Sequence, residues 1–169
     1  MTATKAGGKV IAIDPGKAGG LACLSRGGTK YTLHEVRDMP DLDTLEGLQE
    51  LVGFIRKWKA TTVIVETQRW RSGNSAKATW SHARHYGKVE ACVALAGAFR
   101  VPVEPQVWMR KVQMQVGVCA VVGLKDTKAR TWALAGLLFP TVSLLGPRGG
   151  KKDGLADAIC LAWYYLQGL

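Results

Sequence analysis

Four carboxylate side chains occupy positions in the sequence from which they could act together. Asp14 ends the apolar segment VIAID, and Glu66 ends a second apolar segment, TTVIVE. Asp153 and Asp157 are four residues apart, which places them on one face of a helix. Ligands in open α/β sheets gather at the carboxyl ends of strands, so two parallel neighbours would set Asp14 beside Glu66. The sequence therefore predicts a cluster of acids from two strands and one helix.

Such a cluster requires a counter-charge. At about 4 Å and an effective dielectric constant of about 20, each pair of like charges costs about 4 kcal/mol. Ligand sets made only of oxygen favour hard cations such as Mg²⁺ or Mn²⁺. Two such ions about 4 Å apart can activate a water molecule and stabilise the leaving oxygen of a phosphodiester. The acids therefore indicate metal-dependent hydrolysis of a phosphate ester.

Each acid also has an ordinary structural explanation. An aspartate before Pro-Gly commonly forms a turn, and a glutamate at the end of a strand can simply be solvated. Asp153 can cap its helix, and Asp157 can pair with Lys151 or Lys152. Taken singly, these explanations prevail. The combination of the four acids, at positions expected to converge, favours a shared site.

The pattern of apolar residues predicts the elements that would position the acids. Expected strands cover 9–14, 21–25, 29–36, 61–66 and 101–105. Expected helices run from a cap at Asp43 or Thr44 to about 58–59, from about 75 to 99, from 105 through 109, over 125–140 and over 153–167. Segment 116–124 is left unassigned. The first three strands form an antiparallel meander, and the whole chain, 1–169, is expected to be one α/β domain with a five-stranded mixed sheet flanked by helices.

The charge of the chain is strongly positive and unevenly distributed. The formal net charge is +10, with nine Lys and Arg against seven Asp and Glu over 1–65, and fourteen against six over 66–169. A basic excess of this size predicts an anionic partner, and nucleic acid is the natural candidate. A generally basic soluble protein is the alternative interpretation.

Cysteine spacing and hydropathy indicate where the protein is found in the cell. The cysteine spacing fits a reducing compartment. The four cysteines are far apart and form no CxxC pair, which argues against a zinc site or a disulfide framework. The longest apolar runs are about half of the roughly 18 residues that a membrane span needs. The first residues have no apolar core typical of a signal peptide. We therefore expect a cytoplasmic protein without a membrane partner.

Five segments together resemble the RuvC-like Holliday junction resolvases, and most of all the small phage-type members. They are IDPGKAGG, VETQ, PVEPQVW, KARTWALAGLLFP and KDGLADAICLAWY, and their order and spacing extend over nearly the whole chain. The resemblance implies a ribonuclease H-like fold, a homodimer, and two Mg²⁺ ions per active site, with Mn²⁺ as a substitute, held by Asp14, Glu66, Asp153 and Asp157. It also implies paired symmetric nicks in a four-way (Holliday) DNA junction by metal-activated water.

The resemblance also suggests which residues contact branched DNA. In this family the loop after the second catalytic strand enters the junction centre, often with an aromatic residue. Trp70 is the candidate here, with Arg69 and Arg71 beside it to hold phosphates. A partly buried loop anchor is the alternative role for Trp70. The other expected DNA contacts, each of which could also be an ordinary solvated charge, are Lys77, Lys111, Arg148 and Lys151.

The chain departs from the family pattern around its last acids. Asp153 and Asp157 are four residues apart, whereas some relatives space the corresponding pair by three. Lys152 stands where the phage-type proteins often have a histidine. A charged lysine cannot ligate a metal, but it can contact the scissile phosphate or stabilise the leaving group. Lys152 is therefore expected to be catalytic without being a metal ligand, and the division of roles with Lys151 stays open.

Other functions are compatible with parts of this pattern. A related ribonuclease H-like nuclease acting on flaps, forks or RNA–DNA hybrids would need the same acids. A protein that grips branched DNA without cutting it would need only the basic residues. Actin-like ATPases and sugar kinases also open with an apolar strand, an aspartate and a glycine-rich turn, but they need two such domains. The leading hypothesis is a Mg²⁺-dependent endonuclease that resolves four-way junctions.

Overall fold

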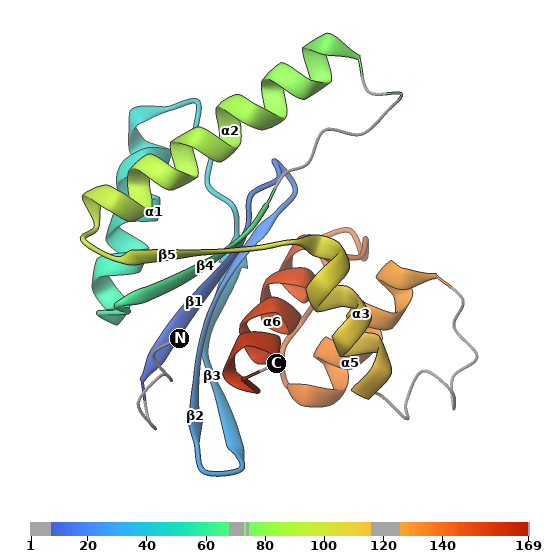
Figure 1. The fold of residues 1–169 in the computed structure, drawn as a ribbon. Helices are drawn as coiled ribbons and strands as arrows, with labels where there is room; N and C mark the ends of the chain where they lie inside the picture. Colours follow the sequence, from blue (N-terminus) through green and yellow to red (C-terminus); the bar gives the residue numbers. More distant parts are fainter. Residues whose placement is uncertain (1–7, 68–72, 74, 116–125, 169) are drawn as a thin grey trace.

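A computed structural model describes residues 8–67, 73, 75–115 and 126–168. Its centre is a five-stranded sheet with the order β3-β2-β1-β4-β5 (Figure 1). The strands are β1 (Lys9–Asp14), β2 (Gly20–Gly27), β3 (Lys30–Asp38), β4 (Thr62–Glu66) and β5 (Phe99–Val103). β2 is antiparallel to both β1 and β3, whereas β4 is parallel to β1 and β5 is parallel to β4. The predicted meander and mixed sheet are confirmed.

Helices cover both faces of the sheet (Figure 1). One face carries α1 (Leu45–Trp58) and α2 (Ala76–Leu95), and the other carries α3 (Pro105–Gln115), α5 (Thr127–Leu138) and α6 (Asp153–Leu166). Alternate residues of β1 pack against the helices on opposite faces of the sheet. Val10 and Ala12 pack in the core with α6, while Ile11 and Ile13 pack in the core with α1 and α2. Burial on both sides explains why β1 reads as an unbroken apolar run.

Helix α6 is the central helix of its layer. It contacts β1, β2, β3 and β4, as well as α3 and α5. All of its side chains are buried except those of Asp153, Asp157 and Tyr165. Two charged residues on an otherwise buried helix are costly to keep unless a partner or a ligand compensates them. The packing of α6 therefore singles out the two aspartates.

Two of the predicted helices differ from the observed ones. α2 ends at Leu95 and not at residue 99, because Gly97 adopts a φ of 76° and turns the chain into β5. α3 continues to Gln115, beyond the predicted end at 109. The cap of α1 is Thr44, whose hydroxyl accepts a hydrogen bond from the amide of Gly47 at 3.0 Å. Residues 116–124, which the sequence leaves unassigned, lie outside the described residues.

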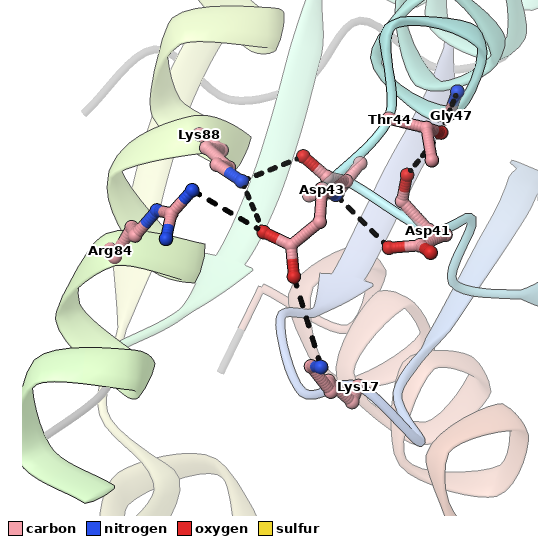
Figure 2. A network of polar contacts seen from close by, with 8 residues as sticks. Lys17, Asp41, Asp43, Thr44, Gly47, Arg84 and Lys88 are labelled. Carbon is pink, nitrogen blue, oxygen red and sulfur yellow. Dashed lines mark hydrogen bonds and ion pairs between the residues drawn. The ribbon is translucent and has the colours of Figure 1, made fainter. Parts of the chain in front are cut away.

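A surface network joins the β1–β2 turn to both helices of the first layer (Figure 2). Asp43 lies 2.5 Å from Nζ of Lys88, 3.7 Å from Arg84 and 3.8 Å from Lys17. The hydrogen bond and charge of Lys88 lower the pKa of Asp43 below its usual value, and the other two cations add to this effect. Exposed ion pairs of this kind contribute little to the free energy of unfolding.

No helix within the described residues is both long and apolar enough to cross a membrane.

Candidate active site

The sheet brings Asp14 and Glu66 to the same edge. β1 and β4 are parallel, with Ala12 opposite Ile64 and Ile13 opposite Val65. Asp14 and Glu66 are the next residues along, so they end neighbouring strands side by side. This arrangement follows the parallel pairing that the sequence analysis assumed.

Glycines allow α6 to approach this edge closely. A Cβ atom on Gly154 would lie 2.3 Å from the carbonyl oxygen of Ala18 and 2.5 Å from Cα of Gly19. A Cβ atom on Gly20 would lie 2.5 Å from the carbonyl oxygen of Gly154. The first turn of α6 and the β1–β2 turn therefore meet backbone to backbone. This close approach carries Asp153 and Asp157 to the end of β1.

A cleft of about 430 Å³ lies where these elements meet. Its charged lining consists of four aspartates and four lysines: Asp14, Asp38, Asp153, Asp157, Lys17, Lys128, Lys151 and Lys152. Glu66 is not part of this lining. It lies beside the cleft, where its Oε2 accepts a hydrogen bond from Nε1 of Trp108 at 2.8 Å. The structure thus gathers three of the predicted acids in one cleft and sets the fourth next to them.

The carboxylates interact electrostatically. Burial, together with the negative charges of Asp14, Glu66 and Asp153, raises the pKa of Asp157 to about 8. Burial also raises the pKa of Asp14, against the amide of Gly16 and the charge of Lys128. The acids therefore repel one another when they are all ionised.

Lysines supply part of the missing charge. Nζ of Lys128 lies 3.4 Å from Oδ2 of Asp153. Its positive charge also opposes the rise in the pKa values of Asp14 and Asp157. Lys128 extends from α5 and remains two-thirds exposed, with 66 % of its side chain accessible. A screened ammonium at this distance compensates the cluster only in part. Negative charge therefore remains at the site, and a divalent cation could compensate it.

The side chains fit divalent cations by their chemistry but are not yet arranged around one. Within the described ranges, no three His, Cys, Asp or Glu side chains form a group that could hold a metal ion. Two acids have other partners, because Asp153 pairs with Lys128 and Glu66 with Trp108. The donor atoms are nevertheless carboxylate oxygens, the pKa values of Asp14 and Asp157 are raised, and a divalent cation would remove the repulsion among the acids.

Lys152 points to a carboxylate that the sequence analysis did not single out. Its Nζ lies 2.7 Å from Oδ2 of Asp38, the last residue of β3. β3 runs in the same direction as β1, because both are antiparallel to β2, so Asp38 ends at the same edge as Asp14. The rule that located Asp14 would have found Asp38 if the third strand had been extended from residue 36 to 38.

A small hairpin presents basic residues beside the cleft. Gly146 and Gly150 are joined by a backbone hydrogen bond of 2.8 Å, and the amide of Lys152 donates to the carbonyl of Leu144 at 2.9 Å. Arg148 is exposed at the tip of this hairpin. Lys151 is exposed as well, and its Nζ lies 4.8 Å above the ring of Trp132.

The remaining predicted DNA contacts are dispersed. Lys77 is exposed in the first turn of α2, and Lys111 is exposed on α3, on the other side of the sheet. Neither lines the cleft. Arg69, Trp70 and Arg71 lie outside the described residues.

Asp157→Asn is expected to stabilise the metal-free protein at pH 8. The folded protein holds the Asp157 proton more tightly than the unfolded chain does, because the pKa is raised from 3.8 to about 8. In the wild type, the contribution of Asp157 to the free energy of unfolding is therefore fully present below about pH 4, and it is lost as the pH rises towards 8. Asparagine is neutral throughout, so we expect a gain of about 1–3 kcal/mol at pH 8. Thermal unfolding with a chelator, from pH 4 to 8, measures it.

A matched control for this prediction is Asp126→Asn. Asp126 caps α5 by accepting a hydrogen bond from the amide of Ala129 at 3.0 Å, and asparagine caps a helix equally well. Its pH profile should therefore parallel the wild type. A parallel profile for Asp157→Asn as well would show that Asp157 carries no electrostatic strain.

Comparisons with known proteins identify the fold. No family model and no curated protein sequence matches the chain. Among solved structures, RuvC from Thermus thermophilus in complex with a Holliday junction substrate matches with a TM-score of 0.65 and 16% identity, over 95% of this chain and 96% of that one. The yeast mitochondrial Holliday junction resolvase Ydc2 matches with a TM-score of 0.55 and 17% identity, over 95% and 79% of the two chains.

A viral protein has the same architecture. Fowlpox virus resolvase, solved with Holliday junction DNA, matches with a TM-score of 0.57 and 11% identity, over 95% of this chain and 99% of that one. These similarities span nearly the whole chain at low sequence identity. The chain therefore has the ribonuclease H-like fold of RuvC-type resolvases, as the sequence resemblance implied.

Proposed function

We propose that this protein is a divalent-metal-dependent endonuclease that resolves four-way DNA junctions by paired, symmetric nicks. One observation carries the proposal: Asp14, Asp153 and Asp157 line one cleft at the carboxyl edge of the sheet, and the negative charges of Asp14, Asp153 and Glu66 all raise the pKa of Asp157. The similarity to structures of resolvases, two of them with junction DNA, supports the substrate.

The four acids are the proposed ligands of two Mg²⁺ ions, for which Mn²⁺ can substitute. Bound there, such a pair activates water and stabilises the leaving oxygen of a phosphodiester. The chain itself contributes the placement of the ligands. Asp14 and Glu66 are held by paired strands, and Asp153 and Asp157 by a helix packed directly on the β1–β2 turn. Ligands on such rigid elements keep a precise geometry.

Basic residues are proposed to bind the DNA backbone around this cleft. Lys152 is the proposed catalytic lysine, and a phosphate oxygen can replace Asp38 as the acceptor of its ammonium. Lys151 and Arg148, from the hairpin, extend the phosphate-binding surface. We assign Lys77 and Lys111 to the duplex arms, and Arg69, Trp70 and Arg71 to the junction centre, on the strength of the family resemblance.

Two active sites are needed for paired nicks, so we propose that the protein is a homodimer. We also propose that it is cytoplasmic. The family resemblance implies that the helix equivalent to α2 helps to form the dimer. On α2, Trp80 is 70% exposed and Leu95 is 68% exposed. Single exposed apolar side chains are common on protein surfaces, so the resemblance carries this assignment.

Synthetic DNA substrates test this function directly. The protein is incubated with four-way junction, fork, flap, duplex and RNA–DNA hybrid substrates, in Mg²⁺ or in a chelator, and the nicks are mapped on sequencing gels. We expect paired nicks at symmetric positions of two opposed junction strands, only with the metal. Preferential cutting of flaps, forks or hybrids would identify a different nuclease. A bound but intact junction would identify a non-cleaving binder.

A further inference from the structure

Trp108 places a polar atom in the apolar core beside the proposed active site. Its side chain is completely buried, with an exposed fraction of 0%. It packs in the same core cluster as Val10 and Ile64 of the sheet and Ile159 of α6. The indole Nε1 donates a hydrogen bond of 2.8 Å to Oε2 of Glu66. The core is thus linked to one of the proposed metal ligands by a directed hydrogen bond.

Packing alone does not require this polar atom. A phenylalanine or leucine could occupy an apolar core without the cost of a buried N–H group, which is expensive unless it is hydrogen-bonded. At Trp108 the cost is offset by a carboxylate that lies at the edge of the cleft. The choice of tryptophan therefore serves Glu66 as well as the core.

The donor and the acceptor belong to one rigid neighbourhood. Glu66 is paired with Val103 in the parallel ladder of β4 and β5, and the amide of Thr67 donates to the carbonyl of Val103 at 2.8 Å. α3 begins two residues later, at Pro105. The indole is therefore held by the same strand ends that hold the backbone of Glu66. Its hydrogen bond can then define the orientation of the carboxylate.

An uncharged donor suits a ligand of a cation. Asp153 forms an ion pair with the ammonium group of Lys128, so a positive charge already lies next to that carboxylate. The indole N–H fixes an oxygen of Glu66 without adding a charge that would repel an incoming metal ion. Hydrogen-bond partners of metal ligands act in this way, and their loss typically costs about 10–100-fold in metal affinity or activity.

We propose that Trp108 is a positioning residue, whose indole N–H orients the Glu66 carboxylate towards the divalent cation of the active site. This inference rests on the proposed metal-dependent function. Without the hydrogen bond, the orientation of the Glu66 carboxylate would be less restricted, and binding the ion would cost more conformational entropy. The expected signature is weaker metal binding with an intact fold.

Replacement of Trp108 by benzothienylalanine tests this role. The analogue keeps the bicyclic shape and replaces the N–H group by sulfur. We expect its dissociation constant for Mn²⁺, measured by calorimetry on the DNA-free protein, to rise about 10–100-fold. The Mn²⁺ concentration needed for half-maximal junction cleavage should rise in parallel, with the rate recovering at saturating Mn²⁺. Trp108→Phe removes the same donor and should show the same loss of Mn²⁺ affinity. It replaces the analogue in this test if the analogue folds poorly.

Trp58 provides the matched control. Its Nε1 also donates to a carboxylate, Oε2 of Glu35, at 2.9 Å, but neither residue lines the cleft. The same replacement at Trp58 should leave the Mn²⁺ affinity unchanged. Unchanged affinity in both folded Trp108 variants, with Mn²⁺ binding by the wild type, would overturn the inference alone. A wild-type protein that binds no Mn²⁺, with or without junction DNA, would overturn the proposed function and this inference together.

Discussion

Asp14→Asn is expected to slow cleavage of a four-way junction by about 10²–10⁴-fold. Asparagine preserves the shape of the side chain but removes the charge with which Asp14 would hold a divalent cation. Such a cation contributes several kcal/mol to the transition state, and each 1.36 kcal/mol corresponds to about a tenfold change in rate. Binding of the junction should persist, because the substitution removes a negative charge and no phosphate contact. Single-turnover cleavage and gel-shift titration measure the two effects separately.

Asp126→Asn again serves as the control, because it makes the same chemical change outside the cleft. Its cleavage rate should equal that of the wild type. Unimpaired cutting by Asp14→Asn would remove Asp14 from the set of metal ligands. Joint loss of binding and cooperative unfolding would instead indicate damage to the β1–β2 turn, where the amide of Gly16 interacts with the Asp14 carboxylate.

Gly154→Ala is expected to impair both stability and cleavage. Its new Cβ would lie 2.3 Å from the backbone oxygen of Ala18, and backbone atoms cannot move aside as the end of a side chain can. Overpacking of this kind costs about 1–3 kcal/mol in the free energy of unfolding. α6 must also shift away from β1, and displacement of catalytic groups by about 1 Å can cost about 10²-fold in rate. Chemical denaturation and single-turnover cleavage provide the measurements.

Gly53→Ala is the matched control for this substitution. Gly53 is exposed in α1, and an added Cβ there meets no atom within 4 Å. Alanine is the better helix former by about 1 kcal/mol, so Gly53→Ala should stabilise the protein slightly and leave cleavage unchanged. Wild-type stability and activity in Gly154→Ala would mean that close packing of α6 on the turn is unimportant for the site.

Local sequence predicted the sheet well for a physical reason. β1 and β4 are buried on both faces, so their residues are apolar without interruption, and each run stops where the strand leaves the core. The acids that follow these runs mark the edge of the sheet. The end of α2 was predicted less well, since Ala96 and Ala98 suit a helix and only the φ of 76° at Gly97 shows that the chain turns there.

The roles of Trp108 and Asp38 depend on contacts between distant segments. Trp108 was expected only as part of a short helix, and its hydrogen bond to Glu66 spans 42 residues. Asp38 meets Lys152 across 114 residues. Pairs of this kind leave no periodic pattern, because neither partner changes the local preference of its own segment.

The amino-acid sequence by itself determined the order of the strands and helices along the chain, the acids that end β1 and β4, and the basic excess of the later part. These properties follow from local burial patterns and from composition. Only the tertiary structure decided which groups share the cleft and how they are paired. Backbone contact at Gly154, the Lys128–Asp153 pair and the Trp108–Glu66 hydrogen bond arise when separate elements pack together, since their energies depend on distances that chain order does not specify.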